Sequence, residues 1–296
     1  MALLDDLTLE VESHLSAFTA RQERLTSLAS PVAGTAAPTT IQVAESDALT
    51  RGIIQVDDEL MAVTSFAAAV GDVPAWGRGH AGTTVASHSA GAKVTINPLF
   101  PRARIREAVK ETVDALWPDL FGLGKVEITV AGTQQTYPLP AGVEQVLEVK
   151  YREVGTSGTW GKVGSWQFDA TSNLTEYPTG RTLTIPAHRL PSSVKVEALV
   201  QQRPTITDST ASWDAMGLFP SARACVRYGA LYRTVASVDF AHLGGQPVSA
   251  GYAGRSERLP RGQDLMKQYF ALYQSELENE RARMLAGFRP QMHFQG

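Results

Sequence analysis

Cysteine, surplus charge and long apolar runs are all scarce in this chain. Its 296 residues contain one cysteine, Cys225, which excludes an internal disulfide framework and a cysteine-based zinc site. The 27 basic and 30 acidic side chains give a net charge of −3, which argues against nucleic-acid binding through bulk electrostatics. No run of roughly 18 apolar residues occurs, and the first residues show no basic stretch before an apolar one. We therefore expect neither a visible export signal nor a membrane-spanning segment.

The low content of charge also limits the kinds of fold. Charged residues make up 19% of the chain, below the roughly 25% of ordinary soluble domains, while apolar residues make up 43%. This composition excludes intrinsic disorder of the chain as a whole. The length suggests about two domains. The shortage of charge fits either an unusually large core or surface that is hidden against other subunits.

Four stretches of the chain have the hydrophobic spacing of helices. In each of them apolar residues recur every three or four positions, which lines one face of a helix. The helices are predicted over residues 3–29, 101–117, 220–240 and 261–287.

Two further stretches have the period of two that is typical of strands. They cover about 38–97 and about 122–203, and each contains several short β-branched runs separated by turn residues. In the first stretch, Asp57 and Asp58 are expected to form the hairpin turn between two strands. Both stretches are predicted to fold as antiparallel β modules.

The order of these segments predicts an α+β fold in which a four-helix bundle core carries two inserted antiparallel β modules. The four helices can pack as one bundle only if both β modules project from it. The predicted parts are a helical bundle made of 1–30, 98–121 and 214–288, a first β module at 31–97, a second β module at 122–213, and an extended tail at 289–296.

Small residues gather on one side of the helix predicted from Pro220. Small side chains allow a neighbouring helix to approach closely, so we expect this face to pack against another helix or another subunit. The residues concerned are Ala222, Cys225, Gly229 and Ala236.

The glycine-rich segment Gly77–Gly82 matches the dinucleotide-binding pattern G-x-G-x-x-G. That site needs a helix directly after the glycines and an acidic residue about 20 positions further on. No helical pattern follows Gly82, and Arg102 stands where the acid is needed. We therefore interpret the segment as a tight glycine turn, and predict no nucleotide cofactor.

Histidines flank this glycine turn, but they do not predict a metal site. His80 and His88 follow the acidic run Asp57-Asp58-Glu59, yet nothing in the spacing forces these side chains to converge. We interpret them as loop histidines and turn carboxylates. The sequence also has no G-x-S-x-G elbow and no phosphate-binding P-loop pattern. We predict no catalytic residue, no cofactor and no metal.

Three segments of the first β module carry a resemblance. Residues 51–61 (RGIIQVDDELM), 77–84 (GRGHAGTT) and 88–92 (HSAGA) together resemble a pattern common in virion proteins of tailed bacteriophages. The order of helices and β modules, with an E-x-E-R-A-R-rich last helix and a short tail, looks like the head-to-tail adaptor proteins. These are also called head completion or connector proteins.

This resemblance implies a structural role in the virion neck. It implies a dodecameric ring beneath the portal protein, assembled in the host cytoplasm, with genomic double-stranded DNA passing through the lumen without sequence-specific binding and with no membrane partner. The β part would face the next neck or tail component, a stopper or the tail tube, through a loop with Arg78, His80 and His88. The C-terminal helix and tail would dock on the portal, with these contact residues expected: Arg281, Met284, Phe288, Arg289, Met292 and Phe294.

Two other functions are considered. A minor tail or baseplate protein could bind a host-surface glycan through its β modules, with Trp76, Trp160 and Trp166 stacking on sugars. A hydrolase that degrades cell wall during entry would need a paired-acid or triad arrangement, and the sequence shows none. The adaptor is therefore the function we expect, and the chain is not expected to be an enzyme.

Overall fold

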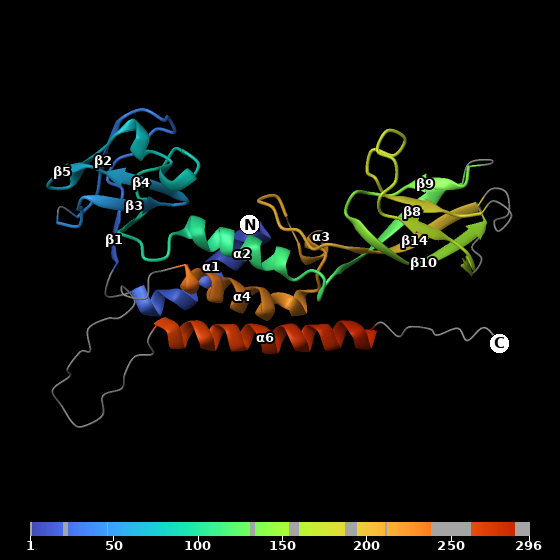
Figure 1. Cartoon of the computed structure of the whole chain (residues 1–296). Helices are drawn as coiled ribbons and strands as arrows, with labels where there is room; N and C mark the ends of the chain where they lie inside the picture. The colour runs from blue at the N-terminus through green and yellow to red at the C-terminus, as the bar shows by residue number, and fades with distance from the viewer. Residues whose placement is uncertain are drawn as a thin grey trace, which may run out of the picture. The chain divides into compact units, whose positions relative to one another are not determined.

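The computed structural model describes residues 2–19, 23–45, 47–130, 134–153, 160–186, 194–210, 212–237 and 262–287 (Figure 1). The chain divides into two compact units. The first unit holds Leu3–Thr112 and Ala224–Ser275, and the second holds Val113–Arg223 together with the end of the last helix from Glu276.

Helices form one part of the first unit. They are α1 (Leu3–Thr19), α2 (Arg102–Ala115), α4 (Arg223–Ala236) and the start of α6 (Gly262–Gly287). Each helix buries one apolar stripe, as its sequence spacing requires. In α1, for example, Leu4, Leu7, Val11 and Leu15 are all buried. Among the described helices, none has both the length and the hydrophobicity needed to cross a membrane.

The first β module forms the rest of this unit and contains two antiparallel sheets. One sheet has the order β1 (Arg24–Ser27), β7 (Lys93–Ile96), β3 (Gly52–Val56) and β4 (Glu59–Val63). The other has the order β2 (Thr39–Gln42), β6 (Val70–Val73) and β5 (Ser65–Ala67). The module has its own apolar core, formed by Leu28, Val32, Ile41, Val43, Leu49, Ile54, Val56, Met61, Val63, Val73, Val94 and Ile96.

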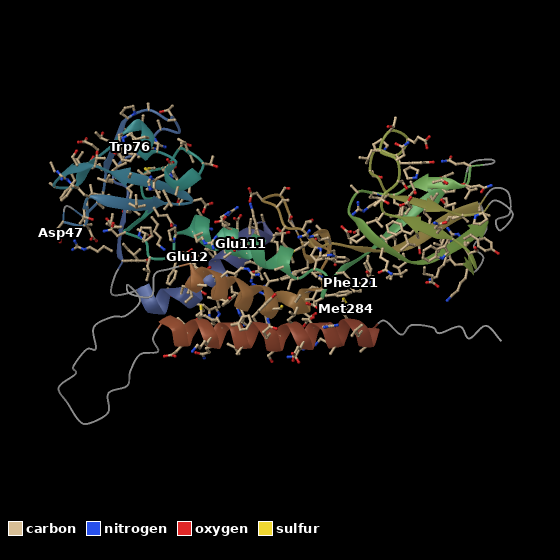
Figure 2. All side chains as sticks on the ribbon, in the orientation of Figure 1. Glu12, Asp47, Trp76, Glu111, Phe121 and Met284 are labelled. Atoms are coloured by element: carbon tan, nitrogen blue, oxygen red, sulfur yellow. The ribbon has the colours of Figure 1, made fainter. Side chains whose placement is uncertain are left out.

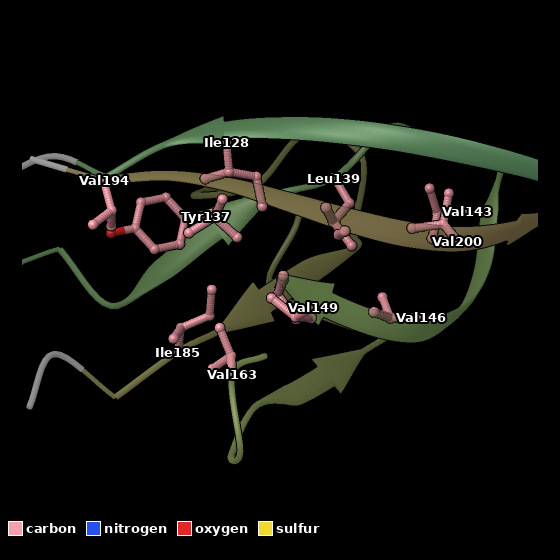
Figure 3. Close-up of a cluster of buried hydrophobic side chains, with 13 residues drawn as sticks. Ile128, Tyr137, Leu139, Val143, Val146, Val149, Val163, Ile185, Val194 and Val200 are labelled. Atoms are coloured by element: carbon pink, nitrogen blue, oxygen red, sulfur yellow. The ribbon is translucent and has the colours of Figure 1, made fainter. Parts of the chain in front are cut away.

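The second β module lies in the second unit and also contains two antiparallel sheets. One has the order β11 (Gly161–Lys162), β10 (Val143–Glu153), β14 (Val194–Gln202) and β8 (Gly122–Thr129). The other has the order β12 (Gln167–Asp169), β13 (Thr182–Thr184) and β9 (Thr136–Pro138). Alternate residues of β14 point inward and are buried, as the period of two predicts. Figure 3 shows the resulting core, in which Leu139, Val149 and Val200 lie among other apolar side chains.

The predicted four-helix bundle core is wrong. The described residues form a mixed α/β structure with four antiparallel sheets, and each β module buries an apolar cluster of its own. The β modules are therefore not projections from a helical core. Apolar spacing identifies which face of each element is buried, but it does not say which other element covers that face.

The long N-terminal helix predicted over 3–29 is also wrong in its extent. Helix α1 ends at Thr19, and Arg24–Ser27 form strand β1, which pairs antiparallel with β7. Leu25 and Leu28 fit a helical period, but Leu25 pairs with Thr95 of β7 in an edge strand of the first sheet, and Leu28 forms a bridge to Val43. The predicted hairpin at Asp57 and Asp58 is confirmed, since β3 and β4 pair directly on either side of that turn.

The helix predicted from Pro220 differs from prediction at its start, whereas the last helix, Gly262–Gly287, agrees with the predicted range. The segment from Pro220 to Ala222 is a 3₁₀ turn, and the α-helix proper begins at Arg223. A one-turn helix, α3 (Trp213–Met216), precedes it and begins with Ser212, whose side chain accepts a hydrogen bond from the Ala215 N–H.

Candidate functional site: the motif loop of the first β module

The residues that carry the virion-protein resemblance meet in one place. They lie in the turn between β3 and β4 and in residues 74–91, the long connection between β6 and β7, which we call the motif loop. The loop contains two 3₁₀ turns, η1 (Ala75–Gly77) and η2 (His80–Gly82), and then runs extended toward β7. A connection of this length with so little regular structure needs other groups to satisfy its backbone.

Two glycines of the motif are required by close approach. A Cβ at Gly77 would lie 2.7 Å from the carbonyl oxygen of Ala62. Gly79 has a φ of +59°, and a Cβ there would lie 2.7 Å from the carbonyl oxygen of Thr83. Both positions therefore need glycine, for backbone reasons within the module.

The carboxylate of Glu59, the first residue of β4, is the centre of the site. It is fully buried and accepts hydrogen bonds from Arg78 Nε at 2.7 Å and Nη2 at 3.1 Å. It also accepts from the backbone N–H groups of Gly79 at 2.9 Å and Ala86 at 3.0 Å. The ring Nε2 of His88 lies 2.9 Å from it. One internal carboxylate thus ties together three points of the motif loop.

Arg78 connects this carboxylate to the neighbouring backbone. Its Nη1 donates to the carbonyl oxygens of Ala33 at 2.9 Å and Thr35 at 3.1 Å, and its Nη2 donates to that of Ala86 at 2.9 Å. All five N–H groups of the guanidinium therefore have an acceptor. The side chain is fully buried and serves to hold loops, not to bind a ligand.

His88 is the third member of the cluster and links it to a fourth, Asp57. Its ring Nδ1 lies 2.8 Å from Asp57 Oδ2, while its Nε2 faces Glu59. Its backbone N–H donates to the carbonyl of Val32, and its carbonyl accepts from the Val32 N–H. Both ring nitrogens of His88 therefore lie within hydrogen-bond distance of a carboxylate.

The environment of Glu59 lowers its pKa. Burial raises the pKa, but hydrogen bonds from Arg78, the Ala86 N–H, His88 and the Gly79 N–H outweigh burial and lower it from 4.5 to about 2. Glu59 is therefore ionised throughout the neutral and mildly acidic range.

The glycine-rich segment matches a nucleotide-binding pattern, but its backbone serves the module itself. The N–H of Gly79 within the segment donates to Glu59, as does the N–H of Ala86 four residues beyond it. The anion in the loop is thus an internal carboxylate. No helix follows Gly82, in agreement with the interpretation as a tight turn.

The same acidic and histidine side chains are not arranged as a metal site. Within the described part of the chain, no group of three or more histidine, cysteine, aspartate or glutamate side chains is placed to hold a metal ion. At the motif loop, the ring nitrogens of His88 face the carboxylates of Asp57 and Glu59 directly.

The loop residues predicted to contact a neck partner have different positions. Arg78 and His88 are buried and fully engaged inside the module, while His80 is half-buried. A partner contact through this loop stays a prediction, and the large apolar side chain that the loop exposes is Trp76, which is 67% exposed in η1. Sequence reasoning placed Glu59 only as a turn carboxylate. Its position directly after a hairpin turn, as the first residue of a strand, was the one available sign.

The residues predicted to dock on the portal are described only in part. Arg281 is 58% exposed in its side chain and pairs with Asp119 at 3.3 Å, while Met284 is half-buried. The rest of the predicted set lies outside the described residues, namely Phe288, Arg289, Met292 and Phe294. Docking on the portal stays a prediction.

The small-residue face lies partly inside the protein. Ala222, Cys225 and Gly229 are buried, and Ala236 is exposed. A Cβ at Gly229 would lie 2.4 Å from Thr112 Cγ2 and 3.0 Å from the ring of Tyr273. Gly229 thus brings α4 close to α2 and α6 within the first unit.

The tryptophans considered for glycan stacking are placed differently from one another. Arg152 lies over the ring of Trp160, 4.8 Å from its centroid. Trp166 packs against the apolar core of the second β module. Trp76, in the first module, is largely exposed.

No protein-family model matches this chain, and no curated protein sequence matches it.

Proposed function

We propose that this chain is a structural virion protein, a head-to-tail adaptor of a tailed bacteriophage. In this proposal it forms a homo-oligomeric ring in the virion neck, beneath the portal protein. The ring connects the capsid to the next neck or tail component and lets genomic DNA pass through its lumen.

The observation that carries the proposal is the internal saturation of the motif loop. Residues of the motif that resembles virion proteins pair with one another. Arg78 and His88 both contact the carboxylate of Glu59. A site built for catalysis would direct such groups toward a substrate. A loop whose shape is fixed from inside is suited to presenting a rigid surface to another protein.

The exposed surface of this loop also supports a protein partner. Arg78 is the only Lys, Arg, Asp or Glu within residues 74–91, and it is buried. The outward-facing residues are Trp76 and small uncharged side chains. The centres of protein interfaces are depleted of charge and enriched in tryptophan, whereas nucleic-acid interfaces are rich in Lys and Arg.

The proposal is tested by association with portal rings. The full chain and a variant lacking residues 288–296 are each mixed with portal protein of the same phage and recovered on immobilised portal. We expect the full chain to be retained and the truncated chain to be lost while keeping its circular dichroism spectrum. Leu9→Ala, which trims a partly exposed leucine of α1, is the matched control and should be retained. Full-length chain that does not bind portal at any concentration would overturn the proposal.

A further inference from the structure

A cavity opens in the first unit between α1, the first sheet of the β module and the start of α2. Its volume is about 340 Å³. Leu15, Phe100 and Ile105 contribute buried apolar surface, and Leu25 of β1 is 55% exposed beside them. The lining residues with polar side chains are Glu12, Ser16, Glu23, Gln55, Lys93 and Thr95.

Charged groups of the cavity are arranged around its apolar part. Glu12 of α1 pairs with Lys93 of β7 at 3.4 Å, and both side chains remain partly exposed. Glu23 accepts a hydrogen bond from the Leu99 N–H. The cavity therefore combines apolar surface with two carboxylates and an ammonium group, which suits a large apolar group that carries one hydrogen-bond donor.

Trp76 is a side chain of that kind. It is 67% exposed, and the adjacent residues Gly77 and Arg78 are buried and held in place by the network around Glu59. An indole has a broad apolar face, a single N–H donor and a ring that attracts cations such as the ammonium of Lys93. A rigidly held, exposed tryptophan is also the residue type most often found as an interface hot spot.

Trp76 cannot reach the cavity of its own chain. Figure 2 labels Trp76 on the first β module and Glu12 beside the helices, well apart within the first unit. An insertion of Trp76 must therefore join two copies of the chain. Because the two surfaces are different, such a contact is heterologous, and repeated contacts of this kind form a ring when the rotation between neighbouring copies closes.

We propose that Trp76 of one copy inserts into this cavity of a neighbouring copy and is one of the contacts that build the ring. The inference rests on the proposed ring-forming function and names the subunit contact within it. The exposed tryptophan and the open cavity are then the two sides of one interface.

The test uses two variants that each remove one side of the contact. Trp76→Ala removes the inserted side chain, and Leu25→Glu adds a third carboxylate beside the cavity. Both positions are more than half exposed, so both variants should keep the fold, which melting curves will check. Leu174→Glu is the matched control, because it changes a leucine of the second unit that is 68% exposed.

Sedimentation velocity of the full chain over a concentration series gives the readout. We expect the wild type and Leu174→Glu to self-associate, and each of the other two variants to associate at least about 30-fold more weakly. An equimolar mixture of Trp76→Ala and Leu25→Glu should form dimers and nothing larger, because the mixture contains one intact cavity and one intact tryptophan.

The inference is overturned if the wild type stays monomeric up to about 1 mM, if Trp76→Ala associates like the wild type, or if the mixture stays monomeric. These results would leave the proposed function standing as long as the chain forms a ring on the portal. Failure to bind the portal would instead overturn the proposed function.

Discussion

The two β modules have similar strand content but different interiors. The first buries an ion pair, Arg78 with Glu59, in which both side chains are 0% exposed, and adds His88 to it. The buried cluster of the second consists of apolar side chains and a tyrosine. Among its described ion pairs, the carboxylate of Glu148 lies between Lys150 and Lys162 on partly exposed surface.

The interiors differ because the backbone groups of the two modules are satisfied in different ways. In the second module, long paired strands such as β10 and β14 satisfy their own backbone, so apolar packing is sufficient. The motif loop of the first module has few ladder partners, and Arg78 supplies donors to carbonyl groups that no strand reaches. An irregular loop that is held rigidly thus requires a buried charge network to satisfy its backbone. Removing one partner leaves the other charge buried and unpaired.

The largest expected effect comes from Glu59→Gln, which leaves the buried guanidinium of Arg78 without its counter-charge. We expect a loss of about 3–5 kcal/mol of stability in the first module. Native-state hydrogen exchange of β3 and β4 measures it. Glu148→Gln is the matched control, since Glu148 also sits between two cations but on partly exposed surface, and it should cost at most about 1 kcal/mol. If both variants lost the same amount of stability, the buried ion pair of the first module would be no more important than the exposed one of the second.

Acid should affect the first module more than the second. A carboxylate whose pKa is lowered from 4.5 to about 2 stabilises the fold fully above pH 4.5, and that contribution is lost as the pH falls through 2. The loss is on the order of 3 kcal/mol. The difference in stability between wild type and Glu59→Gln should therefore shrink steadily from pH 4.5 to pH 2, measured by urea unfolding at each pH. A difference that does not change with pH would contradict this account.

Overpacking at the α4 contact should have a smaller effect. Gly229→Ala places a Cβ 2.4 Å from Thr112 Cγ2, and we expect it to cost about 1–3 kcal/mol. Gly142→Ala in the second module is the control, because a Cβ there meets nothing within 4 Å. Thermal melting compares the two. An unchanged melting temperature for Gly229→Ala would mean that this helix contact is loose.

Trp76→Ala should change stability least, within about 0.5 kcal/mol, since two thirds of the side chain is exposed. Melting of the variant at a concentration where the chain is monomeric measures this. A large loss would show that Trp76 supports the loop from inside, and would weaken its assignment as a contact residue.

Sequence reasoning predicted elements that depend on local order. The period of two identified both β modules, and the Asp57-Asp58 turn was placed correctly. It failed where partners distant in sequence decide the structure. The spacing of Leu25 and Leu28 predicts a helix, because the pairing of Leu25 with Thr95 of β7 and of Leu28 with Val43 is not visible locally. The four-helix bundle core was inferred for the same reason, since helical spacing does not reveal that each β module has its own core.

The candidate site was predictable only as a motif. The motif indicates Gly77, Gly79, Arg78 and His88, but it gives Glu59 only as a turn carboxylate, because the role of Glu59 depends on a side chain 19 residues further along. The cavity could not be predicted either, since its lining comes from α1, β1, β3, β7 and α2. Arg78 and His88 are buried within the loop, and a partner contact through this loop stays a prediction.

The central claim, that this chain is a neck protein which assembles as a ring, is tested most directly by electron microscopy of the full chain mixed with portal rings. The account predicts a second ring stacked coaxially on one end of the portal. Bare portal rings, with the chain remaining monomeric in the same sample, would contradict it.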